Sequence, residues 1–378
     1  MTGFMPGPHC GRGTLDIIWS CLSTTLLAIW VSLHLRVDSP HAKKVPATMV
    51  LKKLWKEIFE FKVFDPSNTS WPLSWRKIFQ ALRAIFLPEM FVTDAVFDLC
   101  EARRLKVILA KSDIKGFESF SLRQAFFVRI VGVYYEDDCD DRLRPLNRRF
   151  LEEFVRAGRL EFEDLPTDEQ IADRSKSDRL LKSISLIQTL WFIANVIYRL
   201  CVGQQVSLLE DLTAAYAFCG LIQLAAWFRC PQDVCQPFIV HLRPKSSTPQ
   251  QASLQRRDTP IWHEDCVFTY PLICCVVFTC SAAIFSGVHL AAWNYSFASV
   301  AEMWLWRSCS LAMTPLLLMS CGLNGLHNHI IIGIYISILF VVYILSRLAI
   351  IAIAFASFRK APVGIYDDAS WTDIIPHI

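Results

Sequence analysis

The amino-acid sequence predicts an all-α, polytopic helical membrane protein with about six spanning helices and a partly helical cytosolic insertion. Two observations lead to this fold class. The 378-residue chain is 53% hydrophobic and only 19% charged, which leaves too few polar residues to cover an ordinary soluble domain of this size. It also holds several apolar runs of about 20 residues, the length that a helix needs to cross the hydrocarbon core of a bilayer.

Six segments follow from the apolar runs and the charges between them. They are an N-terminal tail with a first spanning helix at 1–36, a cytosolic or interfacial insertion at 37–179, a transmembrane hairpin at 180–228, a polar cytosolic loop at 229–266, three further membrane helices with an interfacial stretch at 267–358, and a C-terminal tail at 359–378. Basic residues gather beside Arg36, Lys182 and Arg229, and such residues favour the cytosolic side. Both termini are therefore expected on the opposite side.

The hairpin carries polar residues inside its apolar runs. Gln188, Asn195 and Arg199 share one face of the first helix by their spacing, and Glu210 opens the second helix. Two interpretations stay open: a polar face that lines a cavity within the membrane, or hydrogen bonds between helices with long side chains that reach the interface. Arg199 and Glu210 are expected to approach each other, because only a short turn separates their helices.

The run at 79–99 has the length of a span but holds a proline and four charged residues, namely Arg83, Pro88, Glu89, Asp94 and Asp98. Each ionised side chain in mid-bilayer costs several kcal/mol. We therefore predict a buried, re-entrant or interfacial helix pair that is broken at Pro88. Asp94 and Asp98 lie one turn apart, which suits a divalent ion or an acid/base pair, although a solvated helix face also explains them.

Topology has further markers in the C-terminal half. Asn294 begins a glycosylation sequon that the alternation of spans places outside the cytosol, whereas the sequon at Asn68 falls on the cytosolic side. The last apolar run, from Ile330 to Phe358, is longer than one crossing requires. Arg347 is predicted to end this span, with an interfacial amphipathic stretch after it.

One acidic run has a spacing known from metal sites. Asp137, Asp138 and Asp141 match the D-D-x-x-D pattern with which class I terpene synthases hold magnesium against a diphosphate, and carboxylate oxygens suit that ion. Such chemistry would use Arg123 and Arg129 to take the leaving group. The second metal motif of those enzymes is absent from the sequence, and a solvated acidic loop also explains the run.

Five segments together resemble those of a large group of uncharacterised multi-pass membrane proteins from filamentous fungi. The segments are residues 16–22 (DIIWSCL), 88–89 (PE), 171–178 (IADRSKSD), 187–192 (IQTLWF) and 371–378 (WTDIIPHI). The resemblance implies a shared fold and a membrane location, and no established activity. This chain departs from the group at residues 124–127, where it reads QAFF and others tend to carry a histidine-glycine-phenylalanine-phenylalanine segment.

No motif in the sequence assigns an activity, and whether the protein is an enzyme stays open. The leading expectation is a multi-pass membrane protein, in an internal or plasma membrane, whose partners are membrane lipids and which needs no cofactor. The alternative is a membrane-embedded enzyme that acts on a lipid or isoprenoid substrate with magnesium, and a small-molecule transporter ranks third. The net charge of +3 is too small to indicate a nucleic-acid partner.

Overall fold

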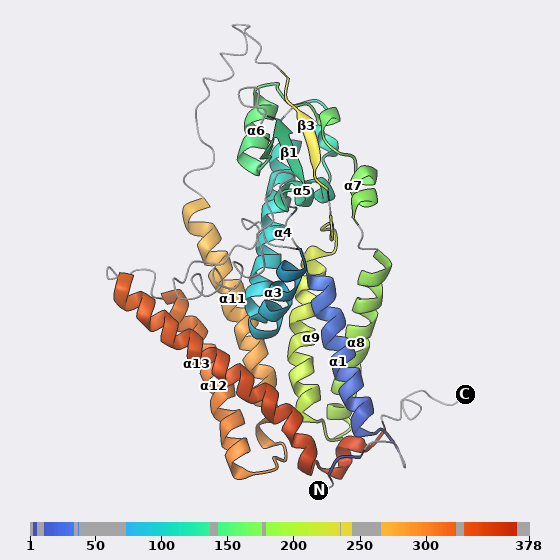
Figure 1. Ribbon diagram of the computed structural model, residues 1–378, viewed down its shortest axis with the longest axis vertical. Coiled ribbons are helices and arrows are strands. Elements are labelled where there is room, and N and C mark those ends of the chain that lie inside the picture. Colours follow the sequence, from blue (N-terminus) through green and yellow to red (C-terminus); the bar gives the residue numbers. More distant parts are fainter. Residues whose placement is uncertain are drawn as a thin grey trace, which may run out of the picture.

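The computed structural model describes residues 3–5, 11–33, 37, 73–112, 114–136, 143–175, 179–234, 236–243, 266–322 and 329–368. This part of the chain is mostly helical (Figure 1). Six long helices form a bundle: α1 (Thr14–Ser32), α8 (Arg179–Cys201), α9 (Leu208–Trp227), α11 (Cys266–Ala291), α12 (Val300–Gly322) and α13 (His329–Ala356). α9 lies at the centre, where it packs against α1, α4, α8, α11 and α13.

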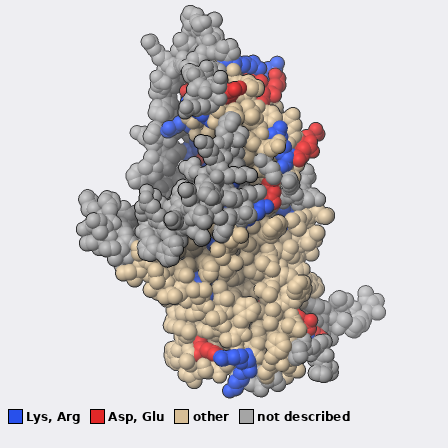
Figure 2. Space-filling model, viewed as in Figure 1, with Lys and Arg blue, Asp and Glu red and all other residues tan. Residues whose placement is uncertain are grey.

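Four described helices are long and apolar enough to cross a membrane, namely those over Leu180–Cys201, Leu208–Trp227, Ile273–Asn294 and Ser337–Lys360. The apolar stretch Thr14–Trp30 is shorter. On the face shown in Figure 2, the lower part of the molecule has a broad surface with few charged side chains, and Lys, Arg, Asp and Glu gather near the two ends. The two helices of the predicted hairpin are therefore confirmed in length and composition, while the count of six spans stays a prediction.

A small sheet corrects the all-α prediction. Its strands β1 (Val133–Glu136), β2 (Leu143–Pro145) and β3 (Phe238–His241) are arranged in the order β2-β1-β3, with β1 antiparallel to β2 and parallel to β3. Strands of three or four residues are too short to show a clear alternation of apolar and polar residues. β3 also comes from the segment 229–266, which the sequence predicts to be a polar loop, and pairing with the distant β1 orders it.

Short helices surround the sheet and join it to the bundle. They are η2 (Phe117–Ser119), α5 (Leu122–Arg129), α6 (Arg148–Arg156), η3 (Phe162–Asp164) and α7 (Asp168–Arg174). Thr167 and Gln170 form the reciprocal hydrogen bonds of a capping box, at 3.0 and 3.3 Å, which fixes the start of α7. α7 ends at Arg174, so it does not run on into α8.

The helix pair α3 (Leu73–Phe86) and α4 (Pro88–Ala110) is broken where the proline predicts. Pro88 is the first residue of α4, a position at which its missing N–H costs nothing. α4 packs against α9 and α11, so its first turn carries Glu89 into the bundle. Asp94 pairs with Arg83 and Asp98 pairs with Arg129, so each of the two carboxylates has its own cation.

Both described ends of the chain meet where the turn 202–207 joins α8 to α9. We call this the hairpin end, and the opposite end, which carries the sheet, the sheet end (Figure 1). The 3-10 turns η4 (Ala292–Asn294), η6 (Ser357–Lys360) and η7 (Val363–Tyr366) also lie at the hairpin end. The backbone N–H of Arg12 donates to the carbonyl oxygen of Tyr366 at 3.0 Å, and the hydroxyl groups of Thr14 and Tyr366 are 2.9 Å apart.

Candidate functional site

A cavity of about 350 Å³ lies at the hairpin end between α1, α8 and α9. Its lining includes all four polar residues that the sequence places in the hairpin: Gln188, Asn195, Arg199 and Glu210. Arg12, Asp16 and Asp368 add charges from the two terminal segments. The structure therefore brings the polar face of α8 together with charged groups that are distant in the sequence.

The carboxylate of Glu210 is held from two sides. It forms an ion pair with Arg12, in which Nη2 and Oε2 are 3.0 Å apart. It also accepts hydrogen bonds from the backbone N–H and the hydroxyl of Ser207, at 2.9 and 2.8 Å. Ser207 in turn accepts from the backbone N–H of Glu210, which completes a capping box at the start of α9.

Arg199 and Glu210 line the same cavity and so approach each other as predicted, but Glu210 forms its ion pair with Arg12 and not with Arg199. The guanidinium of Arg199 is almost fully buried and donates to the carbonyl oxygens of Gln205 at 2.7 Å, Gly364 at 3.1 Å and Asp367 at 2.7 Å. The carboxylate of Glu210 is neutralised by Arg12. Arg199 is instead stabilised by backbone carbonyl groups at the ends of the turn and of η7, whose oxygens carry partial negative charge. Arg12 and Arg199 therefore both bind the backbone of the segment 364–367 and hold it against the bundle.

Three other polar groups of the cavity, Asp16, Asn195 and Gln188, are bonded to their own helices or to α1. Asp16 accepts from the backbone N–H of Gly13 at 2.7 Å and caps the start of α1. Asn195 donates to the carbonyl oxygen of Trp191 at 2.9 Å, and Gln188 donates to the hydroxyl of Thr24 at 3.4 Å. Trp191 also lines the cavity and is 56% exposed, so the cavity reaches the apolar flank of the bundle.

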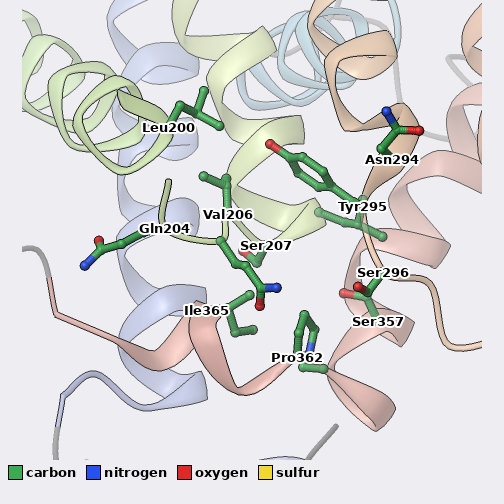
Figure 3. Close-up of a pocket in the computed structure, with 13 residues that line it drawn as sticks. Leu200, Gln204, Val206, Ser207, Asn294, Tyr295, Ser296, Ser357, Pro362 and Ile365 are labelled. Carbon is green, nitrogen blue, oxygen red and sulfur yellow. The ribbon is translucent and has the colours of Figure 1, made fainter. Parts of the chain in front are cut away.

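A second cavity, of about 180 Å³, is lined by the same turn (Figure 3). Gln204, Gln205 and Ser207 line one wall, Tyr295 lines another, and Pro362 and Ile365 close it. Asn294, the residue of the predicted glycosylation sequon, belongs to its rim and is exposed. Burial and the nearby carboxylates of Asp211 and Glu210 raise the pKa of the Tyr295 hydroxyl above its usual range.

A buried ionic cluster lies deeper in the bundle. Arg347 forms an ion pair with Glu89, and the Tyr343 hydroxyl accepts from Arg347 Nε at 2.9 Å and donates to Glu89 Oε2 at 2.8 Å. The guanidinium carbon of Arg347 lies 3.5 Å from the centre of the Phe285 ring. The candidate span Ser337–Lys360 includes Arg347, against the prediction that the span ends there. Glu89 neutralises the arginine inside the bundle, and α13 continues to Ala356.

A second buried pair joins α9 to α11. Nδ1 of His289 lies 3.2 Å from Oδ2 of Asp211, and both side chains are almost completely buried. Trp306 of α12 donates through Nε1 to the carbonyl oxygen of His289 at 3.0 Å. Sequence reasoning missed this pair, although an ionisable residue within an apolar run is itself a signal of function.

The acidic run Asp137, Asp138 and Asp141 lies outside the described residues. Within the described ranges, no group of three or more His, Cys, Asp or Glu side chains is arranged to hold a metal ion. The two arginines that diphosphate chemistry would use have other partners, because Arg129 pairs with Asp98 and Arg123 donates to the carbonyl oxygen of Asp168 at 3.4 Å. The magnesium site remains a prediction from the sequence.

No characterised protein and no solved structure matches the chain. The model of a family of unknown function, DUF8562, matches residues 1–248. The match includes α1, α8 and α9, which form the larger cavity, and Glu89 and Asp211 of the two buried pairs. The helices α11 and α13, which supply His289 and Arg347, follow the matched region. The chain belongs to this family of unknown function, DUF8562.

Proposed function

We propose that the protein is an integral membrane protein with six spanning helices, like the fungal proteins it resembles, and that its larger cavity binds the polar head of a membrane lipid. Four of these six helices have the length and composition of spans, and α1 and α12 are the other two. The protein performs no chemistry on the lipid in this proposal. Its sheet end faces the cytosol and its hairpin end faces the opposite side.

The observation that carries the proposal is the lining of this cavity. The lining has positive charges on Arg12 and Arg199 and negative charges on Asp16 and Asp368. The neutral amides of Gln188 and Asn195 lie beside them. Such a lining suits a dipolar headgroup better than a simple ion. Trp191 extends from the cavity to the apolar flank, and an indole at this level gives an acyl chain a surface to lie against.

The full-length protein, purified in mild detergent, offers a direct test. Native mass spectrometry, followed by lipid extraction, should find a phospholipid retained by the protein. The double variant Gln188→Leu/Asn195→Leu should retain about thirtyfold less, because two lost hydrogen bonds at about 1 kcal/mol each weaken binding by about 2 kcal/mol. Leu190→Ala is the matched control, since Leu190 is exposed on the same helix and does not belong to the cavity lining. Equal retention by the double variant and the control would reject the cavity as the site.

The enzyme alternative is tested on the same preparation. Farnesyl and geranylgeranyl diphosphates are incubated with the protein, with and without magnesium, and thermal stabilisation by the metal is measured in parallel. Unchanged substrates and no stabilisation are expected. Magnesium-dependent consumption of either diphosphate would replace the lipid-binding proposal with the enzymatic one.

A further inference from the structure

Asp211 and His289 are placed where water does not reach them. Their side chains are 5% and 0% exposed, and the only polar contact of the imidazole ring among the described residues is with Asp211. Nε2 of His289 has no partner there. The aromatic rings of Phe285 and Trp306 lie against the imidazole, with ring centres 4.7 and 5.5 Å away. A charge on this pair is therefore not stabilised by solvent.

The charged and titratable side chains around the pair come from α13, α4 and α9, and from Arg12 just before α1. α13 supplies Arg347 and Tyr343, and α4 supplies Glu89, which is already bonded to both. α9 itself supplies Glu210, which Arg12 neutralises, and Tyr216, whose ring packs against Phe285 at 5.2 Å. Arg347 and Glu89 balance each other, and so do Arg12 and Glu210. Asp211 is the one carboxylate of this group without a cation unless His289 is charged.

From this charge balance we propose that Asp211 and His289 form a proton-binding site that is loaded from the hairpin end. With a neutral imidazole and an ionised Asp211, the pair carries one negative charge in the interior of the bundle. Binding of one proton, which rests between Oδ2 and Nδ1, makes the pair neutral overall. The cost of a buried, uncompensated charge favours the loaded state.

The smaller cavity gives the proton a route. Tyr295 lines this cavity and lies close enough to Asp211 and Glu210 for both carboxylates to influence its hydroxyl. In Figure 3 the Tyr295 side chain extends from the loop after α11 towards α9, with its hydroxyl directed at that helix. Asp211 belongs to the first turn of α9, so the phenol of Tyr295, a group that can accept and donate a proton, lies at the cavity wall near the buried pair.

Counting bound protons tests the site. Full-length protein in nanodiscs, in weak buffer, is titrated between about pH 5 and about pH 9, the range in which an imidazole changes charge. The wild type should bind about one proton more than Asp211→Asn over this range. Asp173→Asn, on the exposed face of α7, is the matched control and should keep the wild-type count. Identical curves for the wild type and Asp211→Asn would overturn the proposal.

Two further measurements keep the test decisive if a variant fails to fold. In the wild type, infrared difference spectra between acid and alkaline pH should show a buried histidine or carboxyl group changing protonation, and His289→Gln should abolish that signal. Tyr295→Phe should keep the number of bound protons but slow their uptake after a pH jump. Unchanged uptake in Tyr295→Phe would overturn loading from the hairpin end. None of these results depends on whether the larger cavity binds a lipid.

Discussion

Glu89 and Arg347 form an ion pair inside the helix bundle, although 258 residues separate them in the sequence. Their side chains are 2% and 0% exposed. The pair connects the first turn of α4, at the tip of the broken helix pair, to the middle of α13, which lies beyond the part of the chain that the family model matches. The contact therefore joins the two halves of the protein where neither charge can reach water.

Removing one member of this pair should destabilise the protein strongly. Glu89→Gln or Arg347→Gln alone leaves a buried, uncompensated charge, and we expect a loss of about 3–5 kcal/mol in the free energy of unfolding. The double variant should lose less than the two single losses added together. Unfolding of the full chain by denaturant in detergent measures all three variants.

An ion pair at the protein surface provides the control. Arg359 pairs with Glu302, and the arginine side chain is 65% exposed. Arg359→Gln should cost less than about 1 kcal/mol, because water screens exposed ion pairs. Additive losses at Glu89 and Arg347, or a loss at Arg359 of the same size, would contradict the central role of the buried pair.

Local patterns in the sequence predicted the local features of the fold. The proline at Pro88 located the break between α3 and α4, and two apolar runs located α8 and α9. Each of these signals lies within one continuous stretch of the chain, because helix breaks and helix length depend on neighbours along the chain.

The partners of the buried charges could not be predicted in this way. The excess length of the last apolar run predicts a span that ends at Arg347, and only the packing of α4 against the bundle shows that Glu89 neutralises this arginine. Glu210 likewise found Arg12 rather than Arg199. A single sequence does not say which of several cations meets a given carboxylate, since tertiary packing decides it.

The contact between the two terminal segments should depend on Gly11. This residue has a φ of +114°, and a Cβ added to it would lie 2.3 Å from the carbonyl oxygen of Tyr366. Gly203 also has a positive φ, +74°, but an added Cβ would meet nothing within 4 Å. Gly203→Ala should therefore cost only the strain of the left-handed backbone, about 1 kcal/mol, and Gly11→Ala should cost more. Thermal unfolding in detergent compares the two, and equal losses would contradict a tight contact at Gly11.

Tyr295 should make the stability of the fold sensitive to alkaline pH. Its pKa in the folded protein is raised by burial and by Asp211 and Glu210, so the fold favours the neutral phenol. The resulting stability is complete below the pKa of an unfolded tyrosine, about 10, and is lost as the pH rises through that value towards the folded pKa. Tyr295→Phe should lose less stability than the wild type over this alkaline range. The same alkaline loss in both proteins would show that Tyr295 does not contribute to it.

Glycan mapping tests the orientation of the protein in the membrane. Asn294, residues 3–5 and the segment 359–368 all lie at the hairpin end, and the cations beside Lys182 and Arg229 favour the cytosol for the opposite end. An acceptor sequon fused in front of Met1 should therefore receive a glycan, and glycosidase treatment should shift the mobility of that protein. The natural sequon at Asn68, outside the described residues, should stay unmodified, so Asn68→Gln should leave the mobility unchanged. A glycosidase-sensitive shift that disappears in Asn68→Gln would reverse the orientation, and with it the side from which Tyr295 meets solvent.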